Sequence, residues 1–513
     1  MSKAFLKYLK EEDNFTLTEN GAISLKSTTN WCLDAFGMLG AMKDSSEDDI
    51  LTIFYKAFAE DPETAMRLLF YIRDIRGGQG MRYVFRVILN DLALTHPDIV
   101  KANFDNILFF GRGDDYLSLF NTSLEDDMIQ YCYEVLKEDA DSIKKGGDCS
   151  LLAKWMPSEN TSSETSKYYA RKFISGMHIT ARQYRKLLSS LRAKINIVEA
   201  KMSANKWDEI DFSKLPSRAS MIYSDAFFNH AKEEYTKYLS DVTEGKAKIN
   251  ANALFPVDIV KKAFVCQSNK DRVITDALWK ALPDYFNGNE ETGLCVVDVS
   301  GSMWGTPLLV ALSLGLYCAD KAEGPYKNHF ITFSSRPSLR EIKGNCLADK
   351  LRSMSMADWG MNTNISAVFD LILKTALKNK LSPEALPGKL YIISDMQFDA
   401  CVTSSERYND IANATLFEKI KEKYTKYGYT MPAIVFWNVR ASKCGMYQMK
   451  DTDNCAIVSG YSPSLFKAVI EGTEWINEIK DGKEVTMQKL DPITVMKTAL
   501  YNERYDRVIW NVN

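Results

Sequence analysis

The chain has 513 residues, of which 46% are hydrophobic and 26% charged, and this composition excludes a disordered or fibrous protein. At about 150 residues per domain, the length predicts more than one domain. Lysine and arginine number 64 against 67 acidic residues, so the net charge of −3 excludes nucleic-acid binding through bulk positive charge alone. Any basic surface must be local.

Residues 1–286 predict a helical domain. From Leu51 to Phe286 the apolar residues recur mostly at helical spacing, as Leu187, Leu188 and Leu191 do. Short polar or glycine-containing loops such as RGGQG and THPD divide the segment into helices of ordinary length. This pattern predicts an array of helix pairs without a fixed repeat period.

Residues 287–292 are polar, and we expect them to form a linker because the pattern changes directly after them. Buried strands are predicted at Leu294–Val299, His329–Phe333, Lys389–Ser394 and Ala433–Trp437. Helices are predicted between and after them, at Leu308–Ala322, Ile365–Leu377, Ile411–Tyr427 and Leu465–Glu471. Residues 293–475 thus predict an α/β doubly wound domain with a parallel sheet. We expect residues 476–513 to be a helical extension that packs back on the body, with its helix from Asp491 to Trp510.

Oxygen-bearing side chains follow the predicted strands at the points where ligands bind in such sheets. Asp298, Ser300 and Ser302 follow the first strand, Thr363 precedes a helix, and Asp395 ends a later strand. Carboxylates and hydroxyls are hard ligands that suit Mg²⁺ or another divalent cation such as Mn²⁺. The alternative is that Ser-Gly-Ser is a tight turn and that Asp395 is a helix N-cap.

This half resembles a von Willebrand factor A (vWA) domain with a metal-ion-dependent adhesion site. The resemblance implies that Asp298, Ser300 and Ser302 form the first metal loop, Thr363 the second and Asp395 the third. It also implies a Rossmann-like fold and an open coordination position, where the metal would accept an oxygen from the carboxylate of a partner protein.

The helical half contains an arginine- and glycine-rich turn, RDIRGGQGMR. Glycines let the backbone approach a ligand closely, and the amides at the next helix start favour anions. The G-K-[ST] ending of a nucleotide-binding loop is absent, so we expect no nucleotide cofactor. A helix cap with solvated arginines is the alternative reading. The candidate RNA-contacting residues of this turn are Arg73, Arg76, Arg82 and Arg86.

The same turn resembles the TROVE module of the Ro autoantigen family. Phe110–Tyr116 is similar to the next loop of that module, and Leu152–Ser158, which includes Lys154, is similar to a later one. A TROVE module followed by a vWA domain is the Ro architecture, and the chain is closer still to an uncharacterised TROVE-like/vWA family. The resemblance implies a HEAT-like ring of helices, closed by the vWA domain, that holds structured, small non-coding or misfolded RNA.

A second basic stretch lies between Arg171 and Arg192, with no aspartate or glutamate in the interval. Its charge pattern predicts either a local RNA-contacting surface or simply a solvated helix face. The candidate residues are Arg171, Lys172, Arg182, Arg185, Lys186 and Arg192.

The histidines, the cysteines and the apolar stretches of the sequence bear on catalysis, compartment and membrane association. The four histidines never stand at metal or triad spacing, so no hydrolytic machinery is visible and we expect a protein that is not an enzyme. Ten scattered cysteines without a C-x-x-C pair are typical of reduced cytoplasmic thiols. No uncharged apolar stretch reaches the about 18 residues of a membrane span. The leading hypothesis is a Ro-like RNA-binding scaffold; the rival is a protein-binding module that acts through its metal.

Overall fold

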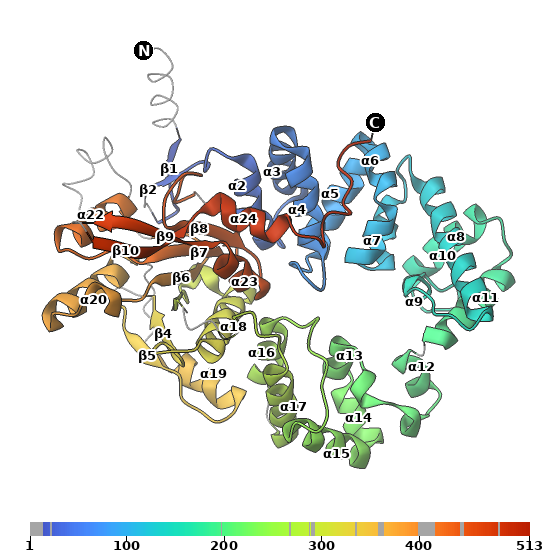
Figure 1. Cartoon of the computed structure of the whole chain (residues 1–513). Coiled ribbons are helices and arrows are strands. Elements are labelled where there is room, and N and C mark those ends of the chain that lie inside the picture. The colour runs from blue at the N-terminus through green and yellow to red at the C-terminus, as the bar shows by residue number, and fades with distance from the viewer. Residues whose placement is uncertain are drawn as a thin grey trace. The chain divides into compact units, whose positions relative to one another are not determined.

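The computed structural model describes residues 14–20, 23–195, 197–265, 268–286, 288, 293–333, 336–357, 364–398, 416–441, 446–480 and 483–512. The chain forms two compact units, each built from separate segments (Figure 1). The first, here called the α/β unit, consists of Met1–Asp61 and Leu254–Asn502. The second, the helical unit, consists of Pro62–Ala253 and Glu503–Asn513.

The α/β unit is built on a sheet that has six strands within the described ranges, in the order β5-β4-β3-β6-β7-β8. The neighbours pair in parallel except β5, which is antiparallel to β4. Strands β3, β6, β7 and β8 are buried along their whole length, as expected for parallel strands covered on both faces. The bounds are β3 Leu294–Val297, β4 His329–Thr332, β5 Leu339–Glu341, β6 Lys389–Ser394, β7 Ala433–Asn438 and β8 Cys455–Ser459.

Helices flank this sheet (Figure 1). Helix α18 is apolar on nearly every side and is buried from Val310 to Ala319, which is typical of a helix enclosed by its own domain. The expectation of a helical array followed by an α/β domain is confirmed at this level. The helices are α2 Trp31–Met38, α3 Glu47–Glu60, α16 Pro256–Phe264, α17 Asn269–Lys280, α18 Thr306–Lys321, α19 Leu347–Ser355, α20 Ile365–Asn379, α22 Leu416–Lys426, α23 Ser464–Glu471 and α24 Pro492–Leu500.

The compact units do not follow the predicted boundaries of 1–286 and 293–475. Helix α2 packs on the sheet, since the Ser459 hydroxyl of β8 donates to the Phe36 carbonyl at 2.6 Å. Helix α17 also belongs to the α/β unit, and its Trp279 donates to Asp320 of α18 at 3.0 Å. Helical periodicity predicts that a segment is a helix, but it does not say which core the helix fills.

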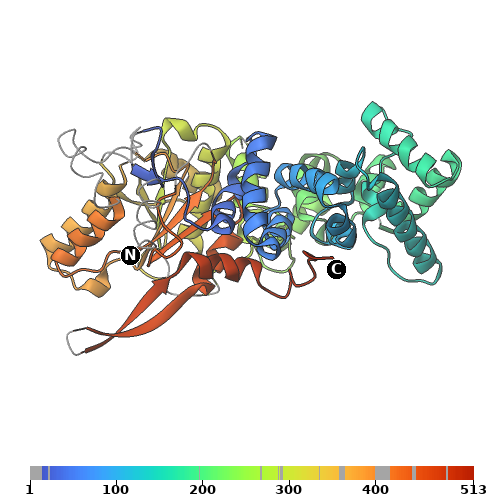
Figure 2. The same cartoon turned by 90° about the horizontal axis from the view of Figure 1, so that it is seen from above.

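The expected helical extension, 476–513, is only partly helical. Strands β9 (Thr473–Lys480) and β10 (Lys483–Leu490) form an antiparallel hairpin (Figure 2), and only α24 (Pro492–Leu500) is helical. A second hairpin pairs β1 (Phe15–Leu17) with β2 (Ile23–Leu25).

The helical unit is an array of short helices and turns. Helix α11 illustrates how they pack, because Tyr184, Leu188 and Leu191 are buried at helical spacing while Arg182, Arg185 and Lys186 are exposed. In the described ranges, every helix is too short or too polar to cross a membrane. The elements are α4 Pro62–Arg73, α5 Arg82–Thr95, α6 Pro97–Ala102, α7 Phe104–Phe110, η2 Gly113–Leu119, α8 Glu125–Lys144, α9 Leu152–Trp155, α10 Glu164–Gly176, α11 Ala181–Ile195, α12 Val198–Ser203, η3 Trp207–Glu209, η4 Phe212–Lys214, α13 Ser217–Ile222, α14 Ser224–His230 and α15 Lys232–Thr243.

The C-terminal segment Glu503–Asn513 belongs to the helical unit. Tyr505 is buried there and stacks on Phe110, with ring centroids 5.3 Å apart. Its hydroxyl donates to Asp74 at 3.0 Å. Asn103 donates to the carbonyl of Ile509 and accepts from its amide. The segment after α24 is therefore held by specific side-chain contacts, although it is not helical.

Candidate metal centre and nucleic-acid interface

Asp298 begins the candidate metal centre, directly after β3. The carboxylate is fully buried, and it accepts hydrogen bonds from the Ser300 amide at 2.8 Å and from the Ser394 hydroxyl at 2.5 Å. Ser394 is the last residue of β6, which pairs with β3 in parallel. The sheet order thus brings together two strand ends that lie far apart in the sequence.

The first and third predicted loops meet at this edge of the sheet. The hydroxyls of Ser300 and Ser302 lie 3.1 Å apart, and a hydrogen bond links Ser302 to the Asp395 carboxylate. Asp395 is 1% exposed and also accepts from the Gln397 amide at 3.2 Å. Four of the five predicted ligands therefore form one cluster. The fifth, Thr363, lies outside the described residues.

The electrostatics of the cluster favour binding of a cation. Burial raises the pKa of Asp298 to about 6, and the charge of Asp395 adds to the rise. Burial also raises the pKa of Asp395, against the hydrogen bond from Ser302 and the charge of Arg440. Two buried carboxylates that repel each other, together with neighbouring hydroxyls, are a donor set that suits Mg²⁺.

This donor set is unusual because it contains few strong ligands. The described residues include no group of three or more His, Cys, Asp or Glu side chains that would hold a metal ion. The candidate centre has only two carboxylates, so a cation there would rely on hydroxyls and water for its other positions. Sequence reasoning missed Ser394, which precedes Asp395 on the same strand end, and Arg440, which donates to the Ser302 carbonyl. Arg440 lies just after β7, so the carboxyl end of that strand was the available signal.

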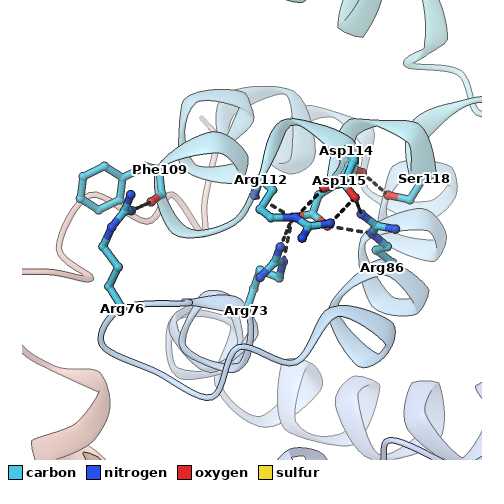
Figure 3. A network of polar contacts seen from close by, with 8 residues as sticks. All are labelled: Arg73, Arg76, Arg86, Phe109, Arg112, Asp114, Asp115 and Ser118. Carbon is cyan, nitrogen blue, oxygen red and sulfur yellow. Dashed lines mark hydrogen bonds and ion pairs between the residues drawn. The ribbon is translucent and has the colours of Figure 1, made fainter. Parts of the chain in front are cut away.

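Arg73 and Arg86, from the arginine-rich turn and the helix after it, belong to a network of ion pairs with Asp114 and Asp115 (Figure 3). Arg73 is 1% exposed, and its Nε and Nη2 both lie 2.7 Å from Oδ2 of the buried Asp115. Arg86 binds the other Asp115 oxygen at 2.7 Å and Asp114 at 3.0 Å. Because these guanidiniums hold buried or half-buried carboxylates together, we remove Arg73 and Arg86 from the candidate RNA-contacting set.

Two glycines, Gly78 of the arginine-rich turn and Gly111 of the loop before η2, have close neighbours. A Cβ at Gly111 would lie 2.4 Å from the Asp115 carboxylate and 2.8 Å from the Ile107 carbonyl. A Cβ at Gly78 would lie 1.9 Å from the Tyr71 carbonyl. Both positions therefore exclude any side chain, and the glycines serve close packing of the chain around the ion-pair network.

Arg76 and Arg82 remain at the surface of this region. Arg76 donates from Nη1 to the Phe109 carbonyl at 3.2 Å and is exposed. Arg82 is exposed as well; partial burial lowers its pKa, and so does the charge of Arg112. Within the described part of the chain, neither guanidinium makes an ion pair.

The second basic stretch, on α10 and α11, divides in the same way. Arg192 is structural, because it donates to the Ala153 carbonyl at 2.8 Å and the Met156 carbonyl at 2.7 Å, closing the turn after α9. Lys172 pairs with Glu125 and Arg185 with Glu159. Half-buried Lys154 lies against the Trp155 ring, 5.5 Å from its centroid. Arg185 is exposed although it is paired, and the exposed residues that make no ion pair in the described part of the chain are Arg171, Arg182 and Lys186.

Sequence reasoning missed several members of this region. Arg112 binds Asp114 through two hydrogen bonds, at 2.9 and 2.5 Å, and lies over the Trp155 ring at 3.9 Å. The opposite charges two residues apart in RGDD were the available signal. Arg504 and Arg507 come from the C-terminal segment and lie over the Phe109 ring. Nothing in the local pattern around them indicated that position.

The comparisons with known proteins cover nearly the whole chain. Residues 292–500 match the family described as a domain of unknown function, DUF7788. Residues 18–110 and 162–284 match another domain of unknown function, DUF2828. The chain is 33% identical over 532 residues to the "Uncharacterized protein L728" of Acanthamoeba polyphaga mimivirus, covering 96% of this chain and 90% of the viral protein. The chain therefore belongs to the same family as this mimivirus protein.

Proposed function

We propose that the protein is a non-enzymatic, Ro-like RNA-binding scaffold for structured or misfolded RNA, in which a vWA-like α/β unit holds a divalent cation. In this proposal the helical unit is TROVE-like and supplies the RNA contacts. We also assign the protein to the cytoplasm, because Cys32, Cys132 and Cys455 are free thiols, as is usual in a reducing compartment.

The observation that carries the RNA proposal is the outward face of α11. The helix has no acidic residue, and Tyr184, Leu188 and Leu191 turn its other side into the core. Arg182 and Lys186 are exposed one helical turn apart. We call these two residues, together with the exposed Arg171 of α10, the α10–α11 face. Exposed cations that make no ion pair within the described residues attract phosphates even on a chain of net negative charge.

Charge reversal on this face tests the proposal. We expect R182E/K186E in the full-length protein to weaken binding to single-stranded or misfolded RNA at least tenfold. The slope of log affinity against log salt should fall by about one to two, because each lost phosphate contact contributes about 0.7 to 1. Fluorescence anisotropy across a salt series measures both quantities.

The matched control is K232E/K237E, which reverses two exposed lysines on α15 of the same unit. Helix α15 also carries Glu233, Glu234 and Asp241, so no phosphate contact is expected there. Equal losses in both variants, or wild-type binding that does not depend on salt, would rule out the α10–α11 face as an RNA contact.

The metal part of the proposal rests on the cluster of Asp298, Ser300, Ser302 and Asp395. When bound, Mg²⁺ would neutralise the two carboxylates and present an electrophilic position at the edge of the sheet. The residues of this chain hold the loops in position: Ser394 fixes Asp298, and Arg440 fixes the backbone at Ser302.

A second candidate function is capture of an acidic side chain of a partner protein by this metal. The observation that favours it is Trp304, which is 83% exposed two residues after Ser302. Exposed tryptophans are frequent anchors of protein interfaces. Asp298→Ala separates the two functions, because partner capture should disappear while RNA affinity survives if the helical unit alone binds RNA.

A further inference from the structure

The helical unit contains a pocket of about 480 Å³ that the RNA proposal above does not use. Its lining combines guanidinium groups with aromatic rings and a few apolar side chains, and the residues that matter here are Ile75, Arg76, Phe109, Arg112, Trp155 and Arg504. The pocket is formed by the loop after α4, the end of α7, the loop before η2, and α9, with Arg504 contributed by the C-terminal segment. It does not include any residue of the α10–α11 face.

One wall of the pocket is a rigid stack. The Arg112 guanidinium lies 3.9 Å from the centroid of the Trp155 ring. Two hydrogen bonds to Asp114 hold this guanidinium in place and balance its charge. Burial opposes the ionised form of Asp114, but the hydrogen bonds and charges of Arg112 and Arg86 together outweigh it and lower the pKa of Asp114 to about 2. Arg112 is thus a fixed planar surface whose charge is largely balanced.

The lining of the pocket also includes an arginine, Arg76, whose guanidinium makes no ion pair within the described residues. Arg76 uses one nitrogen on the Phe109 carbonyl, which leaves other N–H groups of its fork available. Within the described residues the Arg76 guanidinium makes no ion pair, although its backbone amide donates to the Asp74 carboxylate at 3.0 Å. The Phe109 ring itself lies under two further guanidiniums, Arg504 at 5.1 Å and Arg507 at 3.9 Å. Arg504 is paired with Asp74, so the unbalanced positive charge in the pocket lining is that of Arg76.

We infer that this pocket binds one nucleotide of single-stranded RNA, with its phosphate at Arg76 and its base against the Arg112–Trp155 stack. The inference rests on the proposed RNA-binding function and names the element of RNA that is bound. A guanidinium fork matches the oxygens of a phosphate. Bases splayed out of a strand stack on aromatic rings and on guanidinium planes. The volume is within the range of small-ligand pockets.

A neighbouring pocket explains why the occupant is part of a strand. Trp155 and Arg192 also line a second space of about 690 Å³, whose lining includes Lys154 and the hydroxyls of Ser158 and Ser166. Trp155 is common to both pockets. A nucleotide chain that leaves the first pocket would find hydrogen-bond donors and a lysine in the second. A free anion bound in the first pocket would make no use of these groups.

Mononucleotide binding to the full-length protein tests the inference without using long RNA. We expect AMP and UMP to bind, while adenosine and inorganic phosphate bind at least tenfold more weakly, in equilibrium dialysis at low salt. Arg76→Gln should reduce AMP affinity at least tenfold. Trp155→Leu should reduce it as well, with an unchanged circular dichroism spectrum. The matched control is Arg218→Gln, which removes an exposed arginine of α13 in the same unit and should leave AMP affinity unchanged.

The outcomes separate this inference from the proposed function. If phosphate alone binds as tightly as AMP, or if Arg76→Gln has no effect, the nucleotide assignment is wrong even if long RNA still binds through the α10–α11 face. If AMP binds as expected but long RNA shows no salt-dependent affinity, the pocket stands and the scaffold proposal fails. An AMP affinity that falls equally in Arg218→Gln would indicate general charge attraction and overturn the assignment.

Discussion

Asp298 shows how a single buried carboxylate reports on a metal centre. Its pKa is raised to about 6, first by burial and then by Asp395. Between about pH 4 and 6, the Asp298 carboxyl is therefore protonated in the folded, metal-free protein. It is ionised in the unfolded chain, where its pKa is near 4. Stability without metal is fullest below pH 4 for this group and is lost as the pH rises to about 6. A bound cation would remove this loss by stabilising the charged form.

This reasoning predicts a pH-dependent effect of Mg²⁺. In EDTA, Asp298→Asn should stabilise the protein at pH 8 by on the order of 2 kcal/mol and change little at pH 4.5. In the wild type, the rise in melting temperature on adding Mg²⁺ should be larger at pH 8 than at pH 5. Differential scanning fluorimetry measures both effects. A Mg²⁺ effect that is equal at the two pH values, or that persists in Asp298→Asn, contradicts a cation at this carboxylate.

Asp115 is a buried carboxylate of the helical unit, as Asp298 is of the α/β unit, but its role is structural. It is fully buried and accepts from Arg73, Arg86 and the Arg112 amide. Asp115→Ala would leave the buried Arg73 without its counter-charge. Removing one partner of a buried ion pair costs about 3 to 5 kcal/mol, so we expect a large drop in the urea midpoint of the transition that unfolds the helical unit.

The control for Asp115→Ala is Asp141→Ala, which breaks an exposed pair with Lys144. Exposed pairs contribute about 0 to 1 kcal/mol, so this midpoint should hardly move. If Asp115→Ala unfolds no earlier than Asp141→Ala, the network of Figure 3 is not a stabilising core. Arg73 would then return to the candidate RNA contacts.

At the scale of single elements, the sequence predicted the strands and helices that follow from the local pattern of apolar residues. A strand was expected at Leu294–Val299 and is observed at Leu294–Val297, a continuous apolar run. Asp298 after it was expected as a metal ligand, and its complete burial was not foreseen. Strand β8 (Cys455–Ser459) was missed because it is short and follows a polar turn. The network around Asp115 was missed because it depends on which loops meet, and opposite charges near each other in sequence equally describe a solvated loop.

The C-terminal segment gives the clearest example of an element fixed by tertiary contacts. An amphipathic helix was expected from Asp491 to Trp510, but α24 ends at Leu500. Beyond it, Tyr505 is buried between Phe110 and Tyr71. An apolar spacing that suits one side of a helix also suits an irregular strand of chain that inserts single side chains into a core.

Tyr505 should therefore be required for the order of the helical unit. Tyr505→Ala removes a buried ring and its hydrogen bond to Asp74, which should cost about 3 to 5 kcal/mol. Tyr505→Phe keeps the ring and should cost about 1 kcal/mol. Hydrogen exchange in the loop after α4 should accelerate strongly in the first variant and weakly in the second. Equal exchange in both variants would contradict a role for the buried ring.

At the scale of the whole molecule, neither unit is a continuous stretch of sequence. The chain passes from the α/β unit to the helical unit after Asp61, returns after Ala253, and passes over again after Asn502. Core contacts explain each assignment. The Phe286 ring lies 5.0 Å from that of Phe466 in the α/β unit. Periodicity along the sequence carries no information on such contacts, which is why a boundary was expected at residues 287–292.

A fragment of the helical unit should be more stable with the C-terminal segment than without it. A fragment of residues 62–253 lacks the C-terminal segment, so it leaves Phe110 uncovered and Asp74 without Arg504 and Tyr505. Joining residues 503–513 to it through a flexible linker should raise its urea midpoint clearly, because it restores a buried ring and a buried carboxylate's partners. The same linked fragment carrying Tyr505→Ala should lose most of that gain. If the linked segment adds no stability, the helical unit does not require its C-terminal part.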